Sequence, residues 1–386
     1  MTDSNGSNSR FLKSTVHVLL TGFGLALLLL PFFPLSRVLL FTPWLLALTT
    51  LVRLYPLIRS HLRIPKRVRS IVPRASTGST CIASTGLGVA AILAIACFPA
   101  LGNRYTVDVG VMVGIYSLLA LGLNVIVGWA GLLNLGFAAF YAIGAYSYAI
   151  LNTRFDLPFW PGAVLGVLTA GFAGFLLGLP VLRLRGDYLA IVTLGFGEIV
   201  RVVLNNWDSF SNGPNGIMNI DRPVVFSYTV RPPYPFYYLV WITVFIVYFF
   251  LNRLYKSHFG RAWIAVRDDE LAANAMGIPA NRFKLLACII GGAIAGLAGV
   301  LYAAKVSFIS PESFTFMESV TILCMVVLGG MGSLRGCIVG AVILVTLPEL
   351  MRDFSNYRML LFGAAMVVLM IVRPQGLLPP QRRLEA

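Results

Sequence analysis

Ionisable side chains are rare inside the long apolar runs of this chain, and Glu198 is the clearest of them. It lies in the run 188–206, three residues before Arg201, so a helix would bring the two charges together. A charge inside an apolar run is costly and marks either a structural ion pair or a polar pathway. In the second case Thr193, Gly197 and Glu198 are candidates to line a path, and Gly197 would allow the helix to break.

A second polar set interrupts the apolar stretch 108–150. Asn124, Asn134 and Gly136 lie there, and several further glycines are spaced among them. In lipid, non-helical backbone is tolerated only where protein buries it or where it lines a cavity. Residues 128–137 are therefore either a break beside a translocation path, with Asn124, Asn134 and Gly136 as path candidates, or a turn between two helices.

The third candidate is the hydrophilic segment 256–282. The acidic triplet Asp268–Glu270 favours the N-terminus of a short helix. Ala272 and Ala273 favour the interior of this helix, and Gly277 favours its end. A short two-part helix that exposes both signs of charge is typical of a docking surface, whereas a solvated loop would have no reason for this order. The residues expected to form the surface are Arg267, Asp268, Glu270, Ala272, Ala273, Gly277 and Pro279.

Nothing in the sequence indicates enzyme chemistry. The three histidines are isolated, no GxxxxGK[ST] segment is present to bind ATP phosphates, and the five cysteines show no CxxC spacing. The cysteines are expected to act as small apolar residues. The sequence therefore predicts no catalytic residue, no metal site and no cofactor.

The elements that must position the candidate residues are membrane helices. Of the 386 residues, 58% are hydrophobic and only 12% are charged, whereas a soluble domain carries about 25% charged residues. So few charges cannot cover a soluble fold of this size, which excludes a soluble globular enzyme. The net charge of +15 comes from short clusters between apolar runs, which is typical of cytoplasmic loops and argues against a nucleic-acid partner.

Apolar runs of membrane-spanning length predict an all-α polytopic membrane protein with about 10–12 membrane segments in the lipid bilayer. The three weakest runs are short or interrupted by glycine, so they can be re-entrant: 133–151, 188–206 and 319–332. The other runs are 15–34, 38–57, 81–101, 108–128, 159–182, 236–254, 283–304, 336–350 and 357–372.

The charge clusters also predict sidedness. The basic clusters at 53–74 and 253–284 are expected in the cytoplasm. An even number of runs separates them, so the two assignments agree, and both chain termini are then cytoplasmic. The sparsely charged loops expected on the outer side are 102–107, 152–158, 208–235 and 305–318.

Small residues recur at helical spacing in two of the runs. Glycine or alanine occupies every fourth position from Gly162 to Gly178, and a similar set extends from Gly292 to Gly299. Such spacing lets helix backbones approach closely in lipid. We expect tight helix packing, with a sliding or gating role as the alternative.

Several longer motifs stand out along the chain: Leu182–Arg201, Glu270–Gly277, Asn212–Gly216, Ser310–Phe316, Val327–Ser333 and Arg373–Leu377. Glu270–Gly277 is similar to the EAA-type loop by which importer permeases meet their ATPases. Together the motifs resemble the LivM-type permease subunits of bacterial branched-chain amino-acid ABC importers. The resemblance extends from about residue 105 to 380, and a weaker similarity covers the N-terminal helices.

This resemblance implies an ABC-importer permease fold in the bacterial inner membrane. Residues 1–80 would form N-terminal helices with a basic cytoplasmic loop, and 81–386 would form the permease core, with 256–282 as its coupling loop. The implied partners are a homologous LivH-type permease, two ATPase subunits that hydrolyse ATP, and a periplasmic binding protein that delivers leucine, isoleucine or valine.

Other functions stay open at this point. A permease of a related urea or short-chain amide importer would share some of these motifs. A stand-alone secondary transporter would need charges within its membrane segments for ion coupling, and this sequence has few. A structural scaffold would explain neither the glycine-interrupted segments nor the ordered loop.

Overall fold

The computed structural model describes residues 99, 103–182, 184, 186–225, 228–229, 233–350, 363 and 376–378. All of them belong to one compact unit of the chain, Val89–Ala386. Apart from Pro99 and Gly363, the predicted helices at 15–34, 38–57, 81–101 and 357–372 lie outside the described residues, as do the cluster 53–74, the proposed boundary at residue 80 and both termini.

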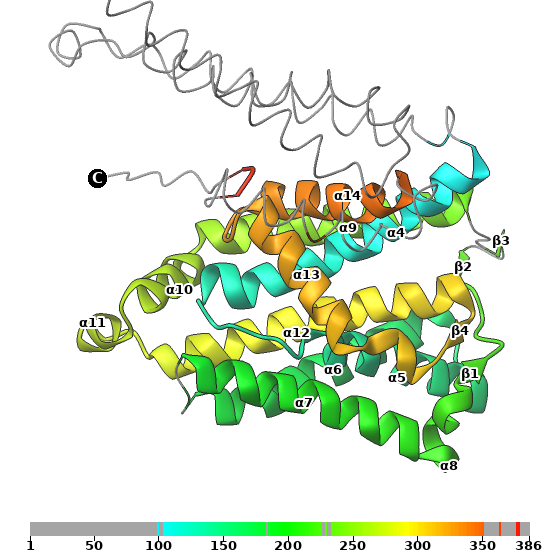
Figure 1. The fold of residues 1–386 in the computed structure, drawn as a ribbon, viewed down its shortest axis with the longest axis horizontal. Coiled ribbons are helices and arrows are strands. Elements are labelled where there is room, and N and C mark those ends of the chain that lie inside the picture. The colour runs from blue at the N-terminus through cyan, green and yellow to red at the C-terminus, as the bar shows by residue number, and fades with distance from the viewer. Residues whose placement is uncertain are drawn as a thin grey trace, which may run out of the picture. The chain divides into compact units, whose positions relative to one another are not determined.

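Long apolar helices form most of the described chain (Figure 1). They are α4 (Arg104–Leu123), which continues as the π-helix η2 (Asn124–Trp129), then α5 (Phe137–Phe155), α6 (Phe159–Val181), α7 (Asp187–Asn206), α9 (Tyr234–Lys256), α12 (Ala280–Val306), α13 (Phe316–Gly329) and α14 (Leu334–Leu350). The short elements are α8 (Asp208–Ser211), η3 (Gly213–Asn215), α10 (His258–Asp268), α11 (Glu270–Ala275), η4 (Pro311–Phe314) and four two-residue strands.

Five helices of the described residues are long and apolar enough to cross a membrane: Arg104–Trp129, Phe159–Val181, Tyr188–Asn206, Tyr234–Lys256 and Ala280–Val306. The predicted all-α polytopic class is therefore confirmed. Two weak runs differ in their bounds: α5 begins only at Phe137, after a non-helical segment, and α13 (Phe316–Gly329) begins and ends three residues before the predicted run 319–332. The run 188–206 is an unbroken helix through Gly197, so the break that this glycine would allow does not occur.

Helix α12 is the centre of the bundle. It packs against α4, α5 and α6, and α4 in turn packs against α9, α13 and α14. Figure 1 shows the same order, with α12 in yellow between α14, α9 and α4 on one side and α5, α6 and α7 on the other.

Glycines bring α12 into backbone contact with its three main neighbours. A Cβ added at Gly296 would overlap Ala170 of α6 and lie 3.0 Å from the Gly166 carbonyl oxygen. Gly291 lies equally close to the Gly122 carbonyl oxygen of α4. Gly299 faces the backbone of α5. The structure thus confirms the predicted packing role of the small residues.

The four loops predicted on the outer side gather at one end of the bundle. Strand β1 (Ile217–Met218) pairs antiparallel with β4 (Phe308–Ile309), which joins the loops 208–235 and 305–318. The Asp221 amide donates to Asn152 Oδ1 at 2.7 Å, and Lys305 Nζ lies 3.1 Å from Oδ2 of Asp108, which is near the start of α4. A second small ribbon, β2 (Val224–Val225) and β3 (Tyr228–Thr229), extends from the same loop.

We predict that Gly296→Ala lowers the free energy of unfolding of the purified protein by about 1–3 kcal/mol, because the methyl group of the new alanine would overlap Ala170. Gly171→Ala is the matched control, since its Cβ would lie in ordinary contact, 3.5 Å from Ala293 Cβ, between the same two helices. Thermal unfolding in detergent measures both. Equal stability of the two variants would contradict the packing role of Gly296.

Candidate functional site

The segment 256–282 folds as the two-part helix that the sequence predicts. Between α10 and α11, Asp269 has extended backbone angles, and its carboxylate accepts the amides of Leu271 at 2.9 Å and Ala272 at 3.0 Å. Asp269 is therefore the N-cap of α11, where a carboxylate satisfies amides that have no partner within the helix. The predicted helix start in the acidic triplet is confirmed.

Gly277 ends this helix pair in the left-handed region, with φ +85°. In the part of the chain that the structure describes, a Cβ at this position would meet nothing within 4 Å, so the backbone conformation is what favours glycine here. The following turn is held by Asn274 Oδ1, which accepts the Ala280 amide at 3.1 Å. Pro279 then precedes the first residue of α12.

Contacts with the start of α12 fix the helix pair to the bundle. Lys284 Nζ lies 2.7 Å from Glu270 Oε1, and the two side chains are 6% and 20% exposed. Trp263 Nε1 donates to the Phe283 carbonyl at 2.7 Å. Ala273 is buried, so of the two predicted alanines only Ala272 is exposed.

The outward side of the helix pair carries large apolar side chains. Leu271 is 67% exposed and Met276 is 82% exposed, and the Asp268 side chain beside them is also exposed. An ordered, partly apolar surface of this kind suits contact with another protein.

Helix α10 also reaches the π-helix η2. The Arg267 guanidinium donates to the Gly128 carbonyl. Trp263 stacks on Trp129 with ring centroids 5.9 Å apart, and Trp129 Nε1 donates to the Gly332 carbonyl at 3.2 Å. The helix pair is thus linked directly to the end of the α4–η2 helix.

Asn124 belongs to this same joint. It is fully buried, and its Oδ1 accepts the Gly332 amide at 2.7 Å, which ties η2 to the turn between α13 and α14. This hydrogen bond of Asn124 therefore links it to the joint between η2 and the α13–α14 turn.

The other path candidates meet along α7. The non-helical residues 130–136 pass beside this helix, where the Leu135 amide donates to Thr193 Oγ1 at 3.1 Å. The Asn134 side chain accepts the Gly136 amide at 3.0 Å, and a Cβ at Gly197 would lie 3.0 Å from Gly136 Cα. Thr193 lies about 9 Å along α7 from the first residue of that helix. Residues 130–136, which contact Thr193, therefore extend into the bundle before α5 begins.

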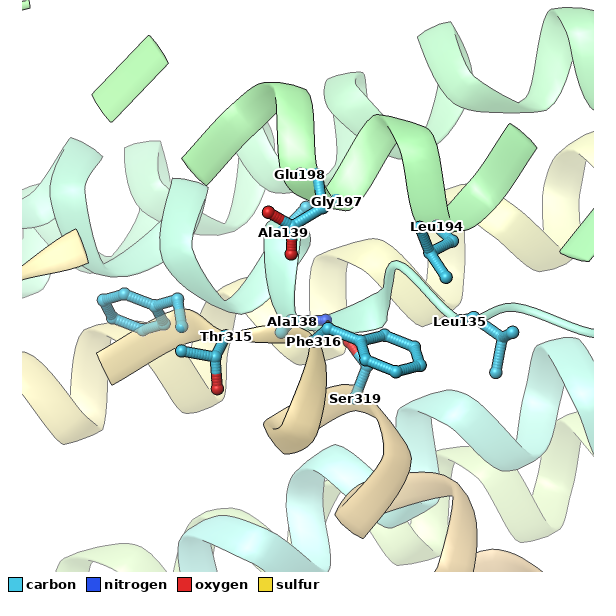
Figure 2. Close-up of a pocket in the computed structure, with 10 residues that line it drawn as sticks. Leu135, Ala138, Ala139, Leu194, Gly197, Glu198, Thr315, Phe316 and Ser319 are labelled. Atoms are coloured by element: carbon cyan, nitrogen blue, oxygen red, sulfur yellow. The ribbon is translucent and has the colours of Figure 1, made fainter. Parts of the chain in front are cut away.

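A hollow lies where α5 begins (Figure 2). Figure 2 shows Glu198 extending from α7 on one side, with Thr315, Phe316 and Ser319 on the opposite side. Ser319 Oγ accepts the Ala138 amide at 2.9 Å in its wall. The hollow thus combines apolar surface with one carboxylate and two hydroxyls; its lining is Leu135, Ala138, Ala139, Leu194, Gly197, Glu198, Phe314, Thr315, Phe316 and Ser319.

Glu198 and Arg201 form an ion pair, with Arg201 Nη2 2.8 Å from Glu198 Oε2. The side chains of Arg201 and Glu198 are 36% and 37% exposed. The ion-pair interpretation of Glu198 is confirmed, and the same carboxylate lines the hollow. A role of Glu198 in a pathway stays a prediction.

A second carboxylate, Glu318, directly precedes Ser319 of the hollow and is not among the site residues predicted from the sequence. Tyr116 Oη donates to Glu318 Oε2 at 3.0 Å. The apolar run begins after Glu318 and so predicts this residue in the loop 305–318, whereas α13 begins at Phe316. The pattern Thr315-Phe-Met-Glu318 matches a capping box. This pattern predicts a helix that begins at Phe316, directly after Thr315, as α13 does.

Long apolar helices, a non-helical segment inside the bundle and an ordered helix pair at one end define a polytopic membrane transport protein. Over residues 105–370 the chain matches the family described as the permease component of the branched-chain amino acid transport system. The chain belongs to this family of membrane permeases. No solved structure matches it.

Individual relatives agree with this assignment. The chain is 46% identical to the high-affinity branched-chain amino acid transport system permease protein LivM of Escherichia coli K12, over 85% of this chain and 82% of the relative. A probable LivM of Methanocaldococcus jannaschii is 28% identical over 69% of this chain and 91% of its own length. The permease protein LivH of E. coli K12 is 26% identical over 68% and 91%.

We predict that Glu270→Lys lowers the free energy of unfolding of the purified protein by up to about 3 kcal/mol, because it leaves the buried Lys284 beside a like charge. The swap Glu270→Lys with Lys284→Glu restores most of this loss. The control Asp268→Lys alters an exposed side chain, so its free energy of unfolding should stay within about 0.5 kcal/mol of that of the native protein. A swap that fails to rescue would argue against the pair.

Proposed function

We propose that the chain is the permease subunit of an ATP-driven importer that moves leucine, isoleucine and valine by alternating access across the bacterial inner membrane. One observation carries this proposal: the chain is 46% identical to a LivM permease over most of its length. The apolar lining of the hollow suits the side chains of these three substrates.

The permease would work with a homologous LivH-type permease, two ATPase subunits and a periplasmic binding protein. The match with LivH permeases supports a companion that has the same core. The joined loops 208–235 and 305–318 offer the binding protein a continuous surface at the outer end. The helix pair α10–α11 would then lie in the cytoplasm, where the basic residues of 253–284 favour it, and both termini would lie on that side.

The ATPases would bind the exposed side of the helix pair, at Asp268, Leu271, Ala272 and Met276. Arg267 and Trp263 would carry the resulting movement to η2 through their contacts with Gly128 and Trp129. From η2 the movement would reach the non-helical residues 130–136, and Asn124 would act on the path through the same joint.

The path itself would run beside α7. Asn134, Gly136, Thr193, Gly197 and Glu198 support this position, because four of them meet along α7 and Glu198 lines the adjacent hollow. Non-helical backbone beside a transport path is typical of membrane transporters.

Uptake of labelled leucine tests the proposed function. Deletion of the gene should abolish energy-dependent leucine uptake, and unlabelled valine and isoleucine should compete with leucine in the native cells. Loss of urea or short-chain amide uptake, with leucine uptake unchanged, would overturn the proposed substrate. Transport by the purified chain alone would overturn the proposed ATPase partners.

We predict that Gly277→Val lowers leucine uptake several-fold while the amount of protein in the membrane is unchanged. The strain of a β-branched residue at φ +85° costs about 1–3 kcal/mol and would shift the helix pair. Gly277→Asn is the matched control, since asparagine tolerates this conformation and should retain most of the uptake. Native uptake by the valine variant would contradict the role of this segment in coupling.

A further inference from the structure

The exposed faces of α6 and α9 differ in chemistry from that of α7. Neither 159–181 nor 234–252 contains a charged residue. Such surfaces suit the hydrocarbon of a bilayer. Their large exposed side chains are Val164, Leu165, Leu168, Phe172 and Leu176 on α6, and Ile242, Phe245, Ile246, Phe249 and Phe250 on α9.

Helix α7 carries charge where a bilayer would be most apolar. Glu198 and Arg201 are more than one-third exposed, and Glu198 lies about 17 Å from the start of a helix about 30 Å long. Contact of such a pair with hydrocarbon is costly, so charges at this depth face protein or water.

Exposed non-helical backbone lies next to α7. Residues 130–136 run beside this helix, and Leu133 within them is exposed. Open non-helical backbone is not found in contact with lipid. The start of α13 lines the opposite wall of the hollow with Phe316. We name this surface, formed by α7, residues 130–136 and the start of α13, the α7 face.

We propose that the α7 face binds the corresponding face of a homologous permease subunit, which thereby closes the hollow at the start of α5. The proposal rests on the proposed function, which supplies a LivH-type companion. A subunit with the same core has the same charged, partly non-helical surface to cover, and two such surfaces cover each other around an approximate two-fold axis. Gly195 supports a close approach, because a Cβ there would meet nothing within 4 Å among the described residues.

Site-specific photo-cross-linking of the native complex tests the proposal. The chain is expressed together with the LivH-type permease of the same organism, with p-benzoylphenylalanine at Ile191 or Ile199 on α7. Matched controls carry it at Leu168 on α6 or Ile246 on α9, because all four side chains are 61–64% exposed. Irradiation of membranes should link the α7 positions, and not the controls, to the companion.

The possible outcomes separate this inference from the proposed function. Failure of the companion to copurify with the native chain would overturn the proposed function. If the companion copurifies, three results would overturn the assignment of the α7 face. These are cross-links only from Leu168 or Ile246, cross-links only to a second copy of this chain, and no cross-link from α7.

A second variant tests the same surface without cross-linking. Gly195→Trp should reduce the companion recovered with the tagged chain about tenfold, because an indole would obstruct a closely packed interface. Leu168→Trp, on the apolar face of α6, should leave recovery unchanged. Equal recovery with the two variants, each present in the membrane at native amounts, would place α7 against lipid and overturn the proposal.

Discussion

Backbone contact at the glycines of α12 is the interaction on which the rest of the bundle depends. In lipid no hydrophobic force drives helices together, so their association relies on close packing. Gly291, Gly296 and Gly299 bring α4, α6 and α5 against the same helix. The position of α5 sets the wall of the hollow, and that of α4 sets the end of η2. Both candidate regions therefore rest on one packed helix.

The helix pair and the hollow are connected through few contacts. Arg267 and Trp263 contact the end of η2, residues 130–136 follow directly in the chain, and Leu135 then contacts α7. A non-helical segment has fewer internal hydrogen bonds than a helix, so its movement breaks fewer of them. This arrangement gives the proposed coupling a short physical route from the loop to the path.

Polar groups are placed unevenly over the bundle surface. The exposed faces of residues 159–181 on α6 and 234–252 on α9 lack charge, whereas α7 carries Glu198 and Arg201 beside non-helical backbone. The cost of exposing a charge or an unpaired backbone group to hydrocarbon explains this division. A permease that works with a companion has one side for the lipid and another for the partner and the path between them.

Local features followed from the sequence alone, because neighbouring residues decide them. Hydropathy predicted the helices, four-residue spacing predicted their close packing, and the acidic triplet with Gly277 predicted the start and end of α11. Only the tertiary structure brought Leu135 to Thr193, 58 residues away, and Tyr116 to Glu318, 202 residues away. Contacts at such separations depend on which helices pack together and in which register, and no local pattern of residues specifies those partners. The contact of Asn124 with Gly332, 208 residues away, has the same cause.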